Sequence, residues 1–432
     1  MPPWDRAEGR TGGPSSHDAI VAGASLAGCA TAIFLGRAGA RVALIEKSPD
    51  PRAFKRICSH YIQASAVPTL ERLELLEPMM EAGGLRSRMR PWTPWGWLET
   101  PAERAGYGVN LRREHLDPML RKTAAETPGV ELMLGWEVCG LLRDGAAVNG
   151  LAARSREGEQ RTLRGQLVVG ADGRDSRIAE MAGVRTKTSP HGRFAYGAYY
   201  EDSHADPENA SFAWLMDPDW AAAFPTDGGL VFYAAMPTKD RLAEFRRDPE
   251  AALVAYMTSL PEAPPPIREQ RRVGPLLGKI EMPNRVSVPV APGLALVGDA
   301  AMAVDPLFGV GCGWALQSAE WLADSVTPAL RGEEPLRRGL RRYRRKHSRV
   351  LRMHAYTINE YASGRRTRPG ERFFFAAAAR DPEIAAKFDE LVTRRAKPVR
   401  TLVTSLPRAI AANSRGAVER LPGKARGRLP NA

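Results

Sequence analysis

The stretch DAIVAGASLAGCATAIFLGRAGARVALIE, residues 18–46, decides the fold. An apolar run at Ala19–Ala22 is followed by a glycine-containing turn, and Cys29–Ala38 then has the composition of a helix. The next apolar run, Arg41–Glu46, has the length and residue types of a second strand. The stretch therefore predicts a βαβ unit, which is the start of a parallel sheet.

The turn Gly23–Gly28 is a variant of the G-x-G-x-x-G fingerprint, with Ser25 in place of the middle glycine. A tight turn and close packing of strand on helix need residues without bulky side chains, and the N–H groups at the helix N-terminus receive a pyrophosphate. Serine is small enough to leave that approach open. Glu46 ends the second strand, where a carboxylate accepts hydrogen bonds from ribose hydroxyls. Together these residues predict a dinucleotide site.

Two further strand ends carry aspartate and glycine. Asp172-Gly173 follows a predicted strand over Leu163–Gly170, and Gly298-Asp299 ends a predicted strand over Leu294–Gly298. The first allows backbone and carboxylate to approach a pyrophosphate, although an ordinary strand-to-helix loop has the same sequence features. The second places a carboxylate where it can bond a polyol chain.

A glycine-rich loop, Asp305–Gly313, follows, and a helix is expected to begin near Trp314. Such a loop brings bare backbone N–H groups and a helix N-terminus toward an electron-rich ring. The positive end of the helix dipole favours negative charge on that ring.

In this order and spacing, the motifs resemble those of the flavoprotein aromatic hydroxylase superfamily, which includes geranylgeranyl-reductase-like enzymes and flavin-dependent halogenases. The resemblance spans about residues 18–325. It implies bound FAD, with NADPH or NADH as reductant and O2 as co-substrate. The family's arginine before R-x-x-L corresponds to Arg113. FAD contacts are implied for Gly23, Ala24, Ser25, Ala27, Gly28, Glu46, Arg113, Val138, Asp172, Gly173, Gly298, Asp299 and Gly311.

The implied fold class is α/β: a Rossmann-like FAD-binding domain of the hydroxylase type, an inserted antiparallel-sheet substrate domain and a helical C-terminal portion. Alternating apolar residues from Phe194 to Tyr200 favour the antiparallel sheet. The expected division is a flexible tail at 1–16, an FAD-binding domain at 17–186 and 291–330, a substrate domain at 187–290, a helical region at 331–413 and a basic flexible tail at 414–432.

The resemblance favours an FAD-dependent monooxygenase that hydroxylates or epoxidises a small aromatic or polycyclic metabolite through a flavin C4a-hydroperoxide. Met302 stands where many hydroxylases have histidine, and Asp305-Pro306 is closer to the reductase and halogenase branches, which remain alternatives. Trp95–Leu98 begins like the halogenase signature W-x-W-x-I-P but lacks its Ile-Pro. The alternative that is not an enzyme is an inactive flavin-binding scaffold.

No catalytic triad is expected, because the cofactor carries the chemistry. Arg56 and His60 lie in a segment that runs beside the flavin in this superfamily, and they are the candidate catalytic residues. Several aromatic residues are candidates for a substrate pocket, although each is individually more typical of a sheet core. They are Trp92, Trp95, Trp97, Phe194, Tyr196, Phe212 and Trp214.

The formal net charge is +13, and much of the excess lies at Arg331–Arg352 and after Arg415. The first of these regions has helical spacing, which favours a solvated helix face over a nucleic-acid site. The four cysteines are far apart without a C-x-x-C pair, so neither a disulfide framework nor a metal site is expected. No apolar run is long enough to span a bilayer, so we expect a cytoplasmic location. We also expect a monomer or homodimer that acts on a small molecule.

Overall fold

The computed structural model describes residues 17–201, 208–262, 265–396 and 398–419. The predicted strands around the dinucleotide turn all form, and they lie in one sheet with the order β18-β19-β10-β1-β2-β7. The pairs β19–β10, β10–β1, β1–β2 and β2–β7 are parallel. The strands of this sheet are β1 (His17–Ala22), β2 (Val42–Glu46), β7 (Val130–Leu134), β8 (Trp136–Asp144), β9 (Ala147–Ser155), β10 (Gln160–Gly170), β18 (Val290–Ala291) and β19 (Leu294–Leu296).

The central strand β1 is buried on both faces. Ala19 and Val21 face a core built with α1 (Leu26–Arg37) and α8 (Val310–Leu330), whereas Ile20 and Ala22 face β8, β9 and β10. This follows from the two-residue repeat of a strand, and it explains why the sequence there is a continuous apolar run. The carboxyl end of β1 is thereby fixed between two layers, beside the dinucleotide turn.

A second sheet has the order β16-β12-β15-β14-β13-β4-β6-β3, with β5 paired to β4. Its strands are β3 (Tyr61–Ile62), β4 (Leu85–Thr93), β5 (Gly96–Trp97), β6 (Tyr107–Asn110), β12 (Ala195–Glu201), β13 (Ser211–Leu215), β14 (Trp220–Thr226), β15 (Leu230–Met236) and β16 (Arg272–Lys279). The pairing of β12 with β15 is antiparallel, as the alternating sequence predicts. The pairing of β13 with β4 is parallel. A small third sheet joins β11 (Thr186–Ser189), β17 (Asn284–Ser287) and β20 (Met302–Ala303).

The expected boundary at residue 187 does not separate the two large sheets, because β3 to β6 come from residues 61–110. Strand β4 was missed since its sequence contains three arginines and a proline. Arg90 is paired with Glu99 and lies over the ring of Trp97. Charge inside the strand is therefore neutralised by partners that the local sequence pattern does not show.

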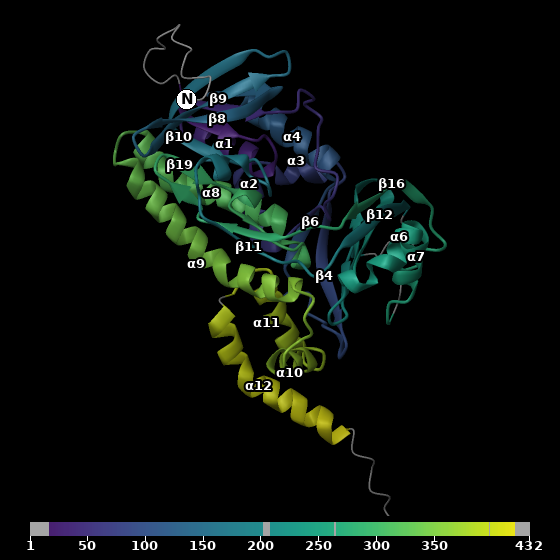
Figure 1. Cartoon of the computed structure of the whole chain (residues 1–432). Helices are drawn as coiled ribbons and strands as arrows, with labels where there is room; N and C mark the ends of the chain where they lie inside the picture. Colours follow the sequence, from purple (N-terminus) through teal and green to yellow (C-terminus); the bar gives the residue numbers. More distant parts are fainter. Residues whose placement is uncertain (1–16, 202–207, 263–264, 397, 420–432) are drawn as a thin grey trace, which may run out of the picture.

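The core interpretation holds for most of the aromatic candidates. Trp92, Phe194 and Trp214 belong to the core between the second sheet and α6 (Leu242–Arg247) and α7 (Pro249–Thr258), which cover the sheet's outer face (Figure 1). Trp97, Tyr196 and Phe212 pack against that core.

The remaining helices lie mainly around the first sheet and at the C-terminal end of the chain (Figure 1). Helix α8 begins at Val310, ahead of the expected Trp314, and its N-cap residue Gly309 has the left-handed conformation that favours glycine. Helix α12 (Pro398–Glu419) extends past residue 414, so the expected tail at 414–432 starts inside a helix. Residues 1–16 and 420–432 lie outside the described part of the chain. The other helices are α2 (Val67–Arg72), α3 (Leu76–Glu81), α4 (Arg113–Glu126), α5 (Arg177–Met181), α9 (Leu336–Ala362), α10 (Pro369–Ala378), α11 (Pro382–Val392) and α12 (Pro398–Glu419).

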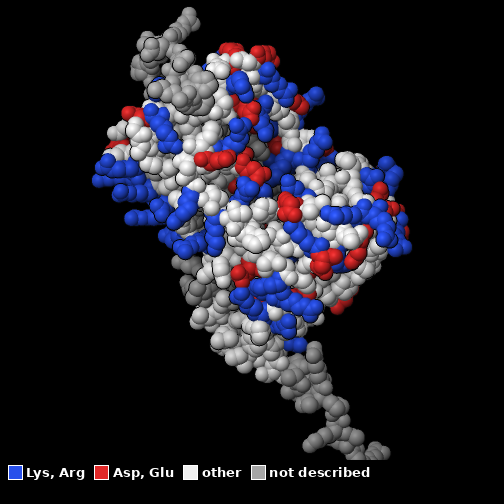
Figure 2. Space-filling model, in the orientation of Figure 1, with Lys and Arg blue, Asp and Glu red and all other residues white. Residues whose placement is uncertain are grey.

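The basic segment forms a solvated face of α9, as expected. Leu340 and Tyr343 are buried, while arginines between them are exposed. Figure 2 shows the resulting group of basic side chains at the left edge, over α9. Among the described residues, no helix is long and apolar enough to cross a membrane, and no group of His, Cys, Asp and Glu side chains is arranged to hold a metal ion.

Candidate functional site

The turn Gly23–Gly28 requires glycine at both ends. A Cβ atom on Gly28 would lie 1.7 Å from the Gly23 carbonyl oxygen, and one on Gly23 would lie 2.5 Å from the Ala171 carbonyl oxygen. Gly23 also has a φ of +107°, which favours glycine. The turn therefore lets α1 start directly at the end of β1. The N-cap residue of α1 is Ser25, which is extended, and the first turn of this helix contains no acidic residue.

Glu46 fixes this turn from the neighbouring strand. Its carboxylate accepts hydrogen bonds from the backbone N–H groups of Ala24 and Ser48, both at 2.9 Å. The predicted acidic residue at the end of β2 is thus beside the dinucleotide turn.

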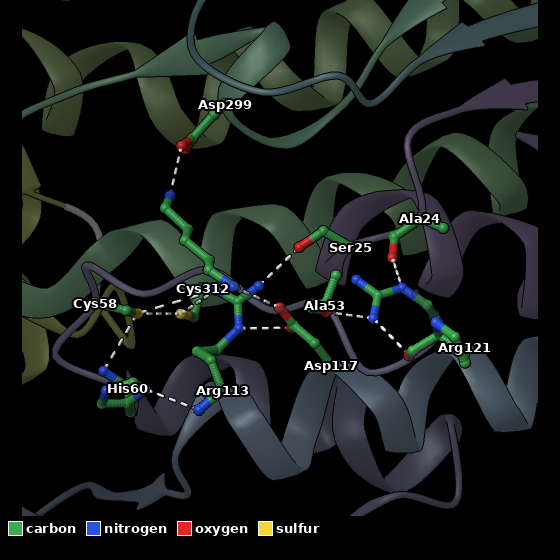
Figure 3. A network of polar contacts seen from close by, with 12 residues as sticks. Ala24, Ser25, Ala53, Cys58, His60, Arg113, Asp117, Arg121, Asp299 and Cys312 are labelled. Carbon is green, nitrogen blue, oxygen red and sulfur yellow. Dashed lines mark hydrogen bonds and ion pairs between the residues drawn. The ribbon is translucent and has the colours of Figure 1, made fainter. Parts of the chain in front are cut away.

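Arg113 is the centre of the polar network in Figure 3. Its side chain is 3% exposed. Nε donates to Asp117 Oδ1 at 2.7 Å, and Nη2 donates to Ser25 Oγ at 2.7 Å. The first residue of α4 is thereby tied to the N-terminus of α1, which supports the expected position of Arg113 beside the cofactor turn.

Asp299 faces the same network from the turn after β19. Lys55 Nζ lies 3.1 Å from Asp299 Oδ2. Burial alone would raise the pKa of Asp299, but the positive charges of Lys55 and Arg174 outweigh it and hold the pKa below its ordinary value. Asp299 is therefore anionic, and Lys55 is a partner that the sequence analysis missed.

Arg121 is a second residue of this network that the sequence motifs did not predict. Its Nε donates to the Ala24 carbonyl at 2.7 Å, and its Nη1 donates to the Pro51 and Ala53 carbonyls. Arg113, Asp117 and Arg121 recur every four residues, so they share one face of α4. That spacing was the available signal in the sequence.

Some predicted residues do not join this network. Asp172 accepts hydrogen bonds from Ser176 Oγ and the Ile178 N–H, and so caps α5 at the surface. Val138 lies on β8, where it packs against the sheet core. The side chain of Arg56 is exposed. Their roles in cofactor binding or catalysis stay predictions.

His60, the other catalytic candidate, is buried at 1% exposure and has a φ of +62°, which is rare for a residue with a side chain. Its Nδ1 accepts the backbone N–H of Arg113 at 2.9 Å, and its Nε2 contacts Tyr199 Oη. Burial lowers the pKa of His60 and raises that of Tyr199. A neutral His60 with its proton on Nε2 therefore donates to Tyr199 and leaves the tyrosine proton available.

Asp305 anchors the turn before α8. It is fully buried, and it accepts hydrogen bonds from His191 Nε2 at 2.5 Å, Arg193 Nη2 at 3.1 Å and the Leu307 N–H at 2.7 Å. Burial opposes ionisation, but Arg193 and His191 prevail and place the pKa of Asp305 well below its ordinary value. The Asp305-Pro306 pair thus connects the turn at α8 to the second sheet.

We expect Asp305→Asn to lower the free energy of unfolding at neutral pH by about 2 kcal/mol, because a charged hydrogen-bond acceptor is lost. A carboxylate whose pKa is depressed in the folded state contributes stability above its unfolded pKa and loses it as the pH falls. The variant should therefore show a shallower decline in stability than the parent between about pH 5 and pH 3. Urea unfolding across this range measures it, with exposed Asp175→Asn as the matched control. Parallel curves for parent and Asp305→Asn would contradict the assignment.

A pocket lies beside this turn, between the second sheet and the C-terminal helices. Its lining is largely apolar and aromatic, with two arginines and two aspartates. The residues that define it best are Trp95, Arg193, Leu215, Trp220, Phe308 and Arg365. Trp95 thus lines a cavity, unlike the other tryptophan candidates, and it stacks on Phe375 with ring planes 8° apart.

The network has the features that FAD requires. The start of α1 offers backbone N–H groups and helix dipole to a pyrophosphate, and Arg113 and Arg121 add positive charge. Among the described residues, no atom lies within 4 Å of the position of a Cβ on Gly173 or Gly311, so the backbone there is open to a ligand. Asp299 would supply an anionic acceptor for a polyol chain.

The dinucleotide turn, the two-sheet architecture and the helical C-terminal portion together define an FAD-dependent oxidoreductase of the hydroxylase and halogenase fold. A family model described as FAD binding domain matches residues 16–256. The chain belongs to this FAD-binding-domain family.

The curated relatives include enzymes of different activities. Menaquinone reductase of Mycolicibacterium smegmatis is 28% identical over 331 residues, with 72% of this chain and 76% of that protein covered. Digeranylgeranylglycerophospholipid reductase of Methanocaldococcus jannaschii is 25% identical and covers 78% and 85%. Kynurenine 3-monooxygenase of Salinispora tropica is 28% identical and covers 71% and 72%.

Solved structures with this fold include the flavin-dependent brominase Bmp2, with a TM-score of 0.74, 19% identity and coverage of 94% of this chain and 100% of that one. The myxobacterial chondrochloren halogenase CndH has a TM-score of 0.69 at 22% identity, covering 90% and 99%. At these identities the likeness shows the fold alone.

Proposed function

We propose that this protein is an FAD-dependent monooxygenase that transfers one oxygen atom from O2 to a small aromatic or polycyclic metabolite, with NADH or NADPH as reductant. The observation that carries the proposal is the compact aromatic pocket beside Leu307 and Phe308, at the turn that opens α8. Leu215, Trp220 and Phe375 are among its apolar and aromatic walls, which is the kind of lining that small-molecule sites have. Such a lining favours a substrate with an aromatic or other flat apolar group.

The pocket is lined by two arginines and by Asp217 and Asp219, so its charged groups favour a substrate that carries both hydrogen-bond acceptors and donors. Arg193 and Arg365 both line it, and arginine recognises planar oxygen pairs by paired hydrogen bonds. Arg193 is itself held by Asp305, so its guanidinium has a fixed position. These contacts would orient the substrate rather than carry out the reaction.

The protein's own chemical contribution is orientation, exclusion of water and proton supply. Bound FAD supplies the two electrons and the activation of oxygen. Tyr199, on the face of the second sheet directed toward the cofactor domain, receives a hydrogen bond from neutral His60 and keeps its own proton to donate. This pair can hold or deliver a proton at Tyr199 Oη during turnover.

The deciding experiment follows products with labelled O2 and NADH or NADPH, using aromatic carboxylic acids and their polycyclic analogues as trial substrates. A monooxygenase gives a product that carries one labelled oxygen atom, and it gives no product without O2. Product that gains two hydrogen atoms without O2 overturns the proposal. Product that gains a halogen when halide is added also overturns it.

A second candidate is a reductase of a polyprenyl lipid or quinone. The relatives named menaquinone reductase and digeranylgeranylglycerophospholipid reductase favour it, as does the Asp305-Pro306 sequence. The apolar lining of the pocket suits part of such a substrate. Turnover of menaquinone without O2 distinguishes this candidate in the same assay.

We expect Leu215→Trp, which fills the pocket, to raise the KM for the accepted substrate at least tenfold, corresponding to about 1.4 kcal/mol. Leu215 lines the pocket, and its other contacts are with hydrophobic core residues. The FAD content should therefore stay at the parent value. Steady-state kinetics with the flavin content measured in parallel test this, and an unchanged KM would place the substrate elsewhere.

A further inference from the structure

Two cysteines that lie far apart in the sequence meet at the candidate cofactor site. Cys58 is in the segment before β3, and Cys312 is in the first turn of α8. Their Sγ atoms are 3.6 Å apart (Figure 3). This is well beyond the length of a disulfide bond, about 2.05 Å, so both are free thiols. The spacing of the two cysteines in the sequence does not indicate this pair.

The surroundings of the pair favour a thiolate. Arg113 Nη1 lies 4.0 Å from each sulfur, and the backbone N–H of His60 donates to Cys58 Sγ at 3.2 Å. The N-terminus of α8 adds the positive end of a helix dipole. Positive charge and hydrogen-bond donors of this kind stabilise a thiolate and make it reactive.

The two sulfurs differ in their roles. The hydrogen bond from Cys312 lowers the pKa of Cys58 well below its ordinary value, and Arg113 and Lys55 lower it further against the effect of burial. The same hydrogen bond raises the pKa of Cys312. Cys58 is also the more exposed of the two, since Cys312 is only 7% exposed. An accessible thiolate with a thiol in contact is the arrangement of an attacking and a resolving cysteine.

The other two cysteines provide a contrast within the same chain. Cys29 is fully buried, and burial raises its pKa. Cys139 is partly exposed, but its Sγ donates to the Ala152 carbonyl at 3.4 Å on the β8–β9 pair. Cys139 therefore has accessibility similar to that of Cys58 without a described contact to another cysteine sulfur.

We propose that Cys58 and Cys312 form a redox-active pair that a hydroperoxide converts to a disulfide. The Cys58 sulfur attacks one peroxide oxygen, the O–O bond breaks, and the leaving oxygen takes a proton, which gives a sulfenic acid at Cys58. The Cys312 sulfur then attacks the Cys58 sulfur as its proton passes to the departing hydroxide, which leaves as water. Two thiols lose two electrons, and hydrogen peroxide becomes two water molecules.

The bond would join the segment before β3 to the N-terminus of α8. Both elements contact Arg113, the centre of the cofactor network. Oxidation therefore links two walls of the cofactor site covalently. The inference concerns the thiols alone and does not depend on the reaction that the enzyme catalyses.

The test treats the full-length, FAD-loaded protein with hydrogen peroxide, blocks remaining thiols with an alkylating reagent after denaturation, and maps the peptides by mass spectrometry. We expect a peptide joined through Cys58 and Cys312 that dithiothreitol separates, with Cys29 and Cys139 alkylated. In Cys312→Ser, the sulfenic acid at Cys58 should persist and be trapped by dimedone. In Cys58→Ser, Cys312 should remain a thiol.

The rate provides a second measure that does not rely on either variant folding well. Cys58 of the parent protein should oxidise at least tenfold faster than Cys139. Complete alkylation of Cys58 and Cys312 after peroxide treatment overturns the proposal. Oxidation of Cys139 at the same rate as Cys58, or disulfides between separate chains in place of the internal one, also overturns it.

Discussion

Arg113→Met is expected to yield a protein without bound FAD and to lower the free energy of unfolding by about 3–5 kcal/mol. Asp117 is 1% exposed, and Arg113 is its buried ion-pair partner. Removing the guanidinium leaves a carboxylate in the core without its opposite charge, which is far more costly than the lost contact alone. The same change removes the hydrogen bond to Ser25 at the dinucleotide turn. Urea unfolding and flavin content of the purified protein measure the two effects.

The double variant Arg113→Met with Asp117→Leu separates folding from cofactor binding. Replacing both members of a buried ion pair by apolar side chains is often neutral for stability. The double variant should therefore recover most of the lost unfolding free energy and still lack FAD. Recovery of FAD together with stability would show that Arg113 acts only through the fold.

Gly28→Val is expected to destabilise the protein by about 3 kcal/mol and to abolish FAD binding. The added Cβ would lie 1.7 Å from the Gly23 carbonyl oxygen, so the backbone itself must move. No change of side-chain rotamer relieves such a contact. The displaced turn would separate the start of α1 from the end of β1, and the N–H groups would no longer converge on a pyrophosphate.

The control for this substitution is Gly370→Val, since a side chain at Gly370 meets no described atom within 4 Å. Thermal unfolding and flavin content should be measured for both variants. Both place valine at a helical position, so the cost of the low helix propensity of valine is matched between them. A Gly28→Val protein that retains FAD at the parent level would contradict the role given to the turn.

The sequence predicted local elements well where the pattern was short-ranged. The strand and turn around Gly23 have a fixed order of apolar run, small residues and helix, and each part is set by its own residues. Likewise Leu340 and Tyr343 alternate with arginines at helical spacing, which is enough to orient α9.

The parts that were missed depend on contacts between distant segments. Lys55 meets Asp299 across 244 residues, and Cys58 meets Cys312 across 254. Nothing in the local pattern of either segment selects its partner. Asp172 shows the opposite case, because an Asp-Gly turn that was assigned to the cofactor also caps α5 in an ordinary way. The spacing of the motifs therefore indicates where the site lies, whereas tertiary packing determines which residues form it.

The most direct test of the account is a titration of the apo-protein with FAD, for the parent and for Asp299→Ala. We expect one FAD per chain for the parent, because one dinucleotide turn, Arg113 and Asp299 converge on one site. Asp299→Ala should weaken the affinity at least tenfold, which is about 1.4 kcal/mol. An affinity for Asp299→Ala equal to that of the parent would contradict the placement of the cofactor in this network.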